Sequence, residues 1–242
     1  MDDSTQTVTM KFQDRETTGQ SGDRDVTRAD ASAPVDLVAL RREYEHGTEL
    51  SADPPLWLFD DIAAPDEMAA LIEPAREILK PAKVSGDTGG RVSPGRTGKN
   101  CWIPHNHSEL TMRLATRISD IAAIPLTHAE SFQVVHYGPG EQYRPHYDAW
   151  KADTGRGERC LARRGQRLIT ALLYLNEVEA GGSTSFPKLR LAVRAAPGTL
   201  VLFHNCRPGT NLVDERSLHG GMPVERGEKW AANLWFRERT SR

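Results

Sequence analysis

The chain has 242 residues, a formal net charge of −2 and a sequence pI of about 6.5. This length is enough for one well-buried domain with extensions. The near-neutral charge gives no electrostatic reason to expect a nucleic-acid or membrane partner, and no apolar run is long enough to span a bilayer. The polar N-terminus lacks the apolar core of a signal peptide, so we expect a cytoplasmic protein.

The N-terminal region is expected to precede the folded domain. Residues 1–33 are almost all polar or charged, which predicts a disordered tail. Residues 36–45 (DLVALRREYE) could form a short helix that stops at Gly47, and residues 51–55 (SADPP) read as a breaker. The pattern therefore predicts a helix and linker over 34–55 and a catalytic domain over 56–242.

Two helices are predicted in the first half of that domain. Pro65 suits a first helical turn, and apolar residues then recur at helical spacing to residue 79. Ser108 is a plausible N-cap for a second helix with one apolar face. The segment 86–100 (GDTGGRVSPGRTGKN) is expected to be a mobile, glycine-rich basic loop.

Short β segments dominate the chain from about residue 132. The segments FQVVHY, RLITALLYLN, GTLVLFH and KWAANLWF are rich in β-branched, aromatic and leucine residues, and Gly/Pro pairs separate them. Helices followed by many strands predict an α+β fold, namely a sandwich or double-sheet jelly roll backed by the N-terminal helices.

A metal-binding pattern stands out in the second half. His146 and Asp148 lie two residues apart in YRPHYDAW, so an extended backbone directs both side chains to the same face. His219 lies in SLHGG, beside glycines that permit close backbone approach. Two histidines and one carboxylate form the facial triad of non-haem Fe(II) oxygenases, which leaves three octahedral positions for a chelating 2-oxo acid and O2.

Lys229 strengthens the prediction because it begins a strand and is expected to point inward. A lysine at a strand start is most often a solvated edge residue. Strand alternation, however, gives one face of this segment four residues, Lys229, Ala231, Asn233 and Trp235. If that face lines the barrel, Lys229 needs an anion, and the distal carboxylate of 2-oxoglutarate would provide one at about 1.5–3 kcal/mol.

Three blocks around these residues resemble the prolyl 4-hydroxylase-like branch of the Fe(II)/2-oxoglutarate dioxygenases. They are QVVHYGPGEQYRPHYDAW, RLITALLYLNEVEAGGSTSFP and DERSLHGGMPVERGEKWAANLWFRE, in the family's order. The resemblance covers about residues 56–239. It implies a double-stranded β-helix and a reaction that couples decarboxylation of 2-oxoglutarate to succinate with hydroxylation of an unactivated C–H by O2.

The resemblance also implies roles for individual residues. Iron would be held by His146, Asp148 and His219, and 2-oxoglutarate by Lys229 with Tyr137 and Thr170. Tyr143, Trp235 and Arg96 match positions near the substrate. Tyr137 and Trp235 could equally be packing aromatics, and Thr170 an ordinary strand residue. Ascorbate is a candidate reductant, and the partner is expected to be a peptide or small-molecule substrate.

Two segments bear on the substrate. Residues 93–102 (SPGRTGKNCW) lie where relatives carry an Arg-Thr-Ser-type loop, but here Gly98, Lys99 and Asn100 follow Arg96 and Thr97. Residues 151–167 are rich in Lys and Arg and are expected to be a solvated loop or a lid that favours an acidic or extended substrate. The substrate could therefore be a peptidyl proline, or a free amino acid or secondary metabolite. A non-catalytic metal-binding jelly roll is a further alternative.

The remaining cysteines and histidines suggest no second site. Cys101, Cys160 and Cys206 form neither a zinc spacing nor a disulfide framework, so three reduced thiols are expected. The other histidines fit no ligand spacing with the triad and are expected to be surface or core residues; they are His105, His107, His128, His136 and His204.

Overall fold

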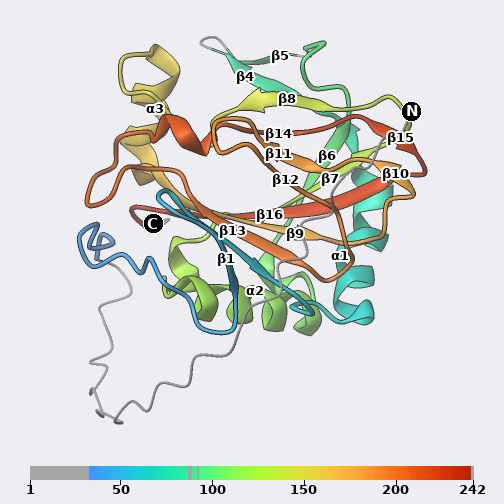
Figure 1. Cartoon of the computed structure of the whole chain (residues 1–242), viewed down its shortest axis with the longest axis horizontal. Helices are drawn as coiled ribbons and strands as arrows, with labels where there is room; N and C mark the ends of the chain where they lie inside the picture. Colours follow the sequence, from blue (N-terminus) through green and yellow to red (C-terminus); the bar gives the residue numbers. More distant parts are fainter. Residues whose placement is uncertain (1–32, 87–88, 92, 241–242) are drawn as a thin grey trace.

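The structure is a computed structural model that describes residues 33–86, 89–91 and 93–240. The predicted tail of residues 1–33 lies outside these ranges except for its last residue. Two antiparallel sheets face each other, and the helices α1 and α2 cover the outer side of the larger sheet (Figure 1). This arrangement is the predicted jelly roll backed by N-terminal helices.

The larger sheet has 8 strands in the order β1-β2-β13-β9-β16-β7-β6-β3. In chain order its strands are β1 (Thr48–Ala52), β2 (Pro55–Phe59), β3 (Lys80–Pro81), β6 (Lys99–Ile103), β7 (Phe132–Tyr137), β9 (Arg167–Tyr174), β13 (Leu200–His204) and β16 (Lys229–Arg237). The four β segments predicted from the sequence correspond to β7, β9, β13 and β16, which lie near the middle of this sheet.

The smaller sheet has 4 strands in the order β12-β11-β14-β8. They are β8 (Tyr143–His146), β11 (Thr184–Phe186), β12 (Leu191–Val193) and β14 (His219–Gly221). Two further pairs are β4 (Val84–Gly86) with β5 (Gly89–Arg91), and β10 (Ala180–Gly181) with β15 (Val224–Arg226). Short 3-10 helices cover His105–His107, Leu126–His128 and Glu215–Ser217.

Both predicted helices are confirmed, and their starts follow from capping chemistry. Helix α1 (Pro65–Ile78) has Pro65 in its first turn, and the Glu67 carboxylate accepts the Ala64 N–H at 3.0 Å. Helix α2 (Glu109–Ala122) begins after Ser108, whose hydroxyl accepts the Thr111 N–H at 3.2 Å. Their buried faces cover the larger sheet and leave its other side to the cavity described below.

The two faces of the larger sheet belong to different apolar clusters. One cluster packs against the helices and includes Leu114, Ile118, Leu234 and Phe236, all fully buried. The other lies between the two sheets and is built around aromatic residues such as Phe186. The chain can bury both faces because strand alternation separates their residues.

The N-terminal boundary was predicted wrongly. Residues 36–45 form no helix, and residues 51–55 are the end of β1, a two-residue turn and the first residue of β2, so the folded domain begins well before residue 56. The Asp36 carboxylate accepts the Val38 N–H, a local turn that competes with a helix. Tyr44, 5% exposed, packs edge-on against Trp57 and therefore ties this segment to the sheet.

Two predicted loops contain regular structure. The 86–100 segment contains parts of the β4–β5 hairpin and β6, because strand pairing uses backbone groups that any residue carries. The 151–167 segment contains helix α3 (Gly155–Arg164), for which Thr154 is the N-cap. Arg237 Nη2 donates to the Cys160 carbonyl at 2.9 Å, a long-range contact that the sequence does not reveal. No helix in the described ranges has the length and apolarity to cross a membrane.

Candidate active site

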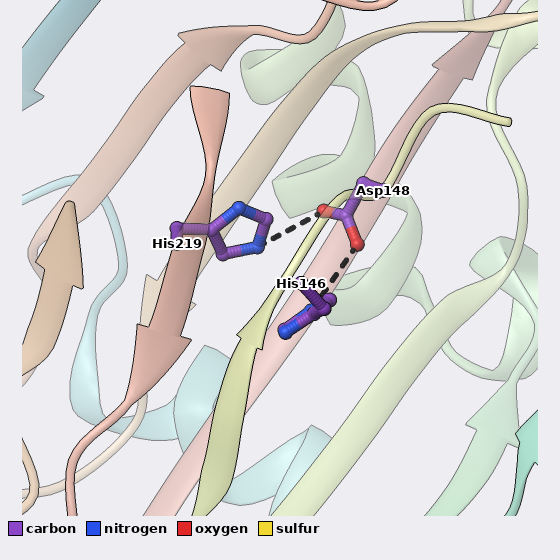
Figure 2. A group of neighbouring side chains, drawn as sticks. All are labelled: His146, Asp148 and His219. Atoms are coloured by element: carbon purple, nitrogen blue, oxygen red, sulfur yellow. Dashed lines mark ion pairs between the residues drawn. The ribbon is translucent and has the colours of Figure 1, made fainter. Parts of the chain in front are cut away.

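Strand pairing in the smaller sheet brings the two predicted histidine ligands together. His146 ends β8, His219 begins β14, and the two residues are register partners. Asp148 lies two residues beyond His146, just past the end of β8. His219 Nε2 is 3.4 Å from Asp148 Oδ2 and His146 Nε2 is 3.6 Å from Asp148 Oδ1 (Figure 2).

The three side chains form a compact set of donor atoms. One potential ligand atom from each lies within 4.8 Å of the others, and no other group of this kind occurs in the part of the chain that the structure describes. Backbone carbonyls orient both imidazoles: Nδ1 of His146 is 3.0 Å from the Arg144 oxygen, and Nδ1 of His219 is 2.9 Å from the Ser217 oxygen. An Nδ1–H donated to each carbonyl leaves Nε2 as the lone-pair donor, as metal sites require.

The electrostatics of the group favour a charged carboxylate. Burial would raise the pKa of Asp148, but the adjacent imidazoles hold it well below its usual range. Burial lowers the pKa of His146, and the neighbouring His219 lowers it further. Burial also opposes charge on His219, but Asp148 raises the pKa of that imidazole. The site therefore presents a carboxylate and a neutral His146, which are the protonation states that bind a metal.

Asp148 is held by two hydrogen bonds from the larger sheet. Thr170 Oγ1 and Trp235 Nε1 each donate to Asp148 Oδ2 at 2.8 Å. Asn205 Nδ2 in turn donates to Thr170 Oγ1 at 2.9 Å. Thr170 is buried and does not line the cavity, so the structure gives it a place behind the carboxylate and not the predicted place against the co-substrate.

Close backbone approach explains one of the glycines beside His219. A Cβ atom on Gly220 would lie 2.9 Å from both the Pro145 nitrogen and the Tyr143 oxygen of β8. Any side chain at this position would push β14 away from β8. Glycine therefore keeps the two histidine-bearing strands at pairing distance.

A cavity of about 740 Å³ opens in front of the triad. The predicted inward face of β16 lines it, with Lys229, Ala231, Asn233 and Trp235 all in its wall. Strand alternation thus places these four side chains on one inward face, as predicted. This volume falls within the usual range of small-molecule sites, roughly 300–1,000 Å³.

Lys229 is a buried cation with neutral partners. The residue is 4% exposed, and its Nζ donates to the Gly182 carbonyl at 2.6 Å and to Thr184 Oγ1 at 3.4 Å. Within the described ranges it forms no ion pair, and burial lowers its pKa to about 8. A dianionic ligand would remove this penalty. Thr184 also lines the cavity; it was not predicted from the sequence, because β11 is short and lacks an alternating pattern.

The other predicted residues also line the cavity. Tyr143 stacks on His146 with ring centroids 3.6 Å apart, and the Arg96 guanidinium lies 4.5 Å from the centre of the Tyr143 ring. Tyr137 is the register partner of Lys229 and also lines the cavity. Burial raises the pKa of Tyr137 to about 12, so its hydroxyl stays protonated. Four predicted residues therefore surround one space, with Trp235 as the fourth.

Helix α3 reaches the cavity through its first turn. Arg156, in its first turn, lines the cavity. Arg164 Nη2 instead donates to the Ala129 carbonyl at 3.1 Å, and Arg163 is exposed outside the cavity wall. The predicted lid position is thus occupied by a capped helix whose first turn faces the site.

Sequence reasoning also missed a buried ion cluster behind Trp235. Arg167 lines the cavity, and its guanidinium lies 3.6 Å from the centre of the Trp235 ring. The Glu130 carboxylate pairs with Arg167 at 2.7 Å and with Arg237 at 3.0 Å. Burial opposes charge on Arg167, but Glu130 raises the pKa of that guanidinium. Glu130 and its partners are at least 37 residues apart in sequence, so no local pattern signals the cluster.

Comparison with known proteins gives the site its class. Residues 132–237 match the profile of the 2OG-Fe(II) oxygenase superfamily. A double-sheet fold with a cluster of two histidines and one carboxylate fits this class. The chain is 32% identical to a probable prolyl 4-hydroxylase 3 of Arabidopsis thaliana over 86% of this chain and 82% of the relative. It is 33% identical to prolyl 4-hydroxylase 5 of the same plant, over 77% of this chain and 69% of the relative.

A solved structure agrees. The viral collagen prolyl hydroxylase of Paramecium Bursaria Chlorella virus-1, in complex with 2OG, superposes with a TM-score of 0.58 at 28% identity. The match covers 75% of this chain and 95% of the viral one. The chain belongs to the prolyl 4-hydroxylase-like family of 2OG-Fe(II) oxygenases. Its reaction is an Fe(II)- and 2-oxoglutarate-dependent hydroxylation by O2, and the predicted jelly-roll fold is confirmed.

Proposed function

We propose that this chain hydroxylates a prolyl residue of a peptide, with iron bound by His146, Asp148 and His219. The donor set fits Fe(II), because the two Nε2 atoms and the carboxylate converge and both Nδ1 atoms are already engaged. When bound, Fe(II) and 2-oxoglutarate supply the oxidising chemistry. The chain's own residues orient the reactants and exclude water.

Lys229 is the observation that carries the co-substrate assignment. It is a buried lysine without a carboxylate partner in the described ranges, and it lines the same cavity as the triad. In the proposal its ammonium and the Thr184 hydroxyl bind the distal carboxylate of 2-oxoglutarate, with Tyr137 beside them. A non-catalytic metal-binding jelly roll would have no reason to keep this costly charge. The enzyme relatives also argue against that alternative.

The peptide assignment rests on the rim of the cavity and on the relatives. Trp102 and Ile78 line the cavity yet remain 45% and 47% exposed, so the site has an open apolar rim that can contact a chain longer than one residue. Tyr143, Trp235 and Arg96 would contact the substrate between this rim and the triad. Relatives named as prolyl 4-hydroxylases support proline as the target. Turnover of a free amino acid or metabolite, but no peptide, would favour the alternative substrate.

Anaerobic titration of the Fe(II)-loaded protein with 2-oxoglutarate tests the site directly. We expect a weak visible metal-to-ligand band that is lost in Asp148→Asn and requires much more 2-oxoglutarate in Lys229→Met. Lys188→Met, at an exposed position outside the cavity, is the matched control. A mass gain of one oxygen on a proline-containing peptide, with succinate formed in equal amount, completes the test. A wild-type band that survives Asp148→Asn unchanged would refute the metal assignment.

We also propose that the protein works in a reducing compartment such as the cytoplasm. All three cysteines are free, and Cys101 and Cys206 are buried. Persistent thiols are typical of proteins that glutathione or thioredoxin keep reduced. Ascorbate would then serve as the external reductant that restores Fe(II), and its omission from long assays is expected to shorten the linear phase.

A further inference from the structure

The cavity has an excess of positive charge. Among the residues that the structure describes, its wall contains two carboxylates, Glu77 and Asp148, and six cationic side chains, Lys80, Lys83, Arg96, Arg156, Arg167 and Lys229. Glu130, behind the wall, neutralises Arg167. Fe(II) and the 2-oxoglutarate dianion together add no net charge. The excess therefore remains when both are bound, and it raises the local concentration of anions.

Arg96 is, besides Lys229, a buried cation of this wall without a carboxylate partner in the described residues. The residue is 8% exposed, and its guanidinium forms no ion pair within the described ranges. Its contacts are neutral: Nη2 donates to Gln133 Oε1 at 3.1 Å, Nη1 donates to the Lys83 carbonyl at 3.4 Å, and Nε has no partner. A buried guanidinium without a counter-ion is costly, and such a group in a ligand cavity marks a binding position.

Two lysines extend this position to the rim. Lys80 in β3 and Lys83 just after it are exposed, line the cavity and form no ion pair in the described part of the chain. The Lys83 carbonyl accepts the hydrogen bond from Arg96 Nη1, so the exposed lysine lies next to the buried guanidinium. Lys229 cannot serve the same anion, because the proposed function assigns it to 2-oxoglutarate.

We propose that the substrate carries a carboxylate close to the hydroxylated carbon, bound by Arg96 and attracted by Lys80 and Lys83. The inference rests on the proposed function and specifies the substrate class for that site. The carboxylate could belong to a Glu or Asp side chain next to the target residue. It could also be the terminal carboxylate of a peptide that ends at the target, or of a free amino acid. Arg96 would form a charge-assisted, bidentate pair with either.

Matched acid and amide ligands test the inference and separate the two sources. The Fe(II)- and 2-oxoglutarate-loaded enzyme is titrated anaerobically, by calorimetry, with proline peptides that differ by Glu or Gln beside proline. Peptides that end in proline as free acid or amide, and L-proline or L-prolinamide, form the other pairs. We expect one acid to bind about tenfold to a hundredfold more tightly than its amide. The side-chain pair identifies an acidic peptide, and the terminal pairs identify a terminal carboxylate.

Variants locate the effect. Arg96→Gln is expected to bring the ratio of acid affinity to amide affinity close to one, and Arg96→Lys to restore part of that ratio. Lys80→Glu with Lys83→Glu is expected to weaken acid binding about tenfold at low salt and far less at about 0.5 M salt. Lys188→Glu is the control for the same kind of charge change outside the cavity.

The outcomes distinguish this inference from the proposed function. If every acid binds no better than its amide, or if none of the pairs binds, the carboxylate inference is wrong. The visible band of the Fe(II)/2-oxoglutarate complex is measured on the same samples. Its presence with no acid preference refutes only the inference, whereas its absence refutes the proposed site on which the inference rests.

Discussion

The two faces of strand β16 illustrate how this chain separates stability from function. One face presents Leu234 and Phe236, both fully buried among apolar neighbours on the helix side. The other presents Lys229 and Trp235 to the cavity, where the buried ammonium has no counter-ion among the described residues and the indole donates a hydrogen bond to Asp148. One side of a single strand therefore stabilises the fold by apolar packing, whereas the other side bears the free-energy cost of burying the Lys229 ammonium. Catalytic sites commonly have this property.

The largest expected effect is the loss of stability when apolar packing on the helix side of β16 is removed. Phe236→Ala should lower the free energy of unfolding by about 3–5 kcal/mol, because it removes a fully buried ring and leaves a cavity. Urea denaturation followed by circular dichroism measures the change. A loss of less than ~1 kcal/mol would show that Phe236 is not tightly packed on the helix side of β16.

Lys229→Met should have opposite effects on stability and on co-substrate affinity. Folding lowers the pKa of Lys229 to about 8, so below pH 8 the folded state carries a penalised charge. Stability then rises with pH from about 8 to 10.5, where the unfolded state binds more protons. Without 2-oxoglutarate at pH 7, the variant should gain about 2 kcal/mol, after allowing for lost hydrogen bonds.

The same variant should bind 2-oxoglutarate about ten- to a hundredfold more weakly, since a charge-assisted bond is lost. Thermal unfolding with and without the co-substrate reports both effects in one experiment. If the variant is instead destabilised without 2-oxoglutarate, the buried Lys229 ammonium does not destabilise the ligand-free protein, and the prediction is wrong.

Thr170→Val tests whether the hydrogen bond to Asp148 increases the affinity for the metal. It keeps the side-chain shape but removes the hydrogen bond to Asp148 Oδ2, so the affinity for Fe(II) should fall about tenfold or somewhat more. Competition with a chromogenic chelator gives the dissociation constant. Thr184→Val is the matched control: it contacts Lys229 and should weaken 2-oxoglutarate binding with little change in metal affinity.

The smallest effect is a pH dependence. Only the protonated ammonium of Lys229 attracts the dianion, so the dissociation constant for 2-oxoglutarate should rise about tenfold between pH 7 and 9, above the pKa of about 8. Tyr174 and Tyr137, the titratable groups beside it, have pKa values raised by burial and stay neutral in this range. Lys229→Arg, charged throughout, should flatten the profile measured by the visible band.

Patterns within single segments revealed much of the fold and the centre of the site. Alternation placed Lys229 and Trp235 on one face, and the spacing of His146 and Asp148 identified the metal cluster. Contacts between distant segments were not visible in the same way. The Glu130–Arg167 pair, the Thr170–Asp148 hydrogen bond and the hydrogen bond between the Tyr44 hydroxyl and His204 Nε2 join residues 37, 22 and 160 positions apart. No local periodicity records such pairings.

The register of His146 against His219 has a mechanical consequence. Strand β8 is the outer strand of its sheet and pairs with β14 alone within that sheet. An iron ion bound by both histidines and Asp148 would act as a cross-link that closes a long loop of chain and pins this strand. Loss of the metal would then loosen β8 and the Arg96 region bridged to Tyr143, and binding of the metal would protect both from proteases. The iron that supplies the oxidising chemistry would thus also stabilise β8 and the Arg96 region, which form the proposed substrate side of the cavity.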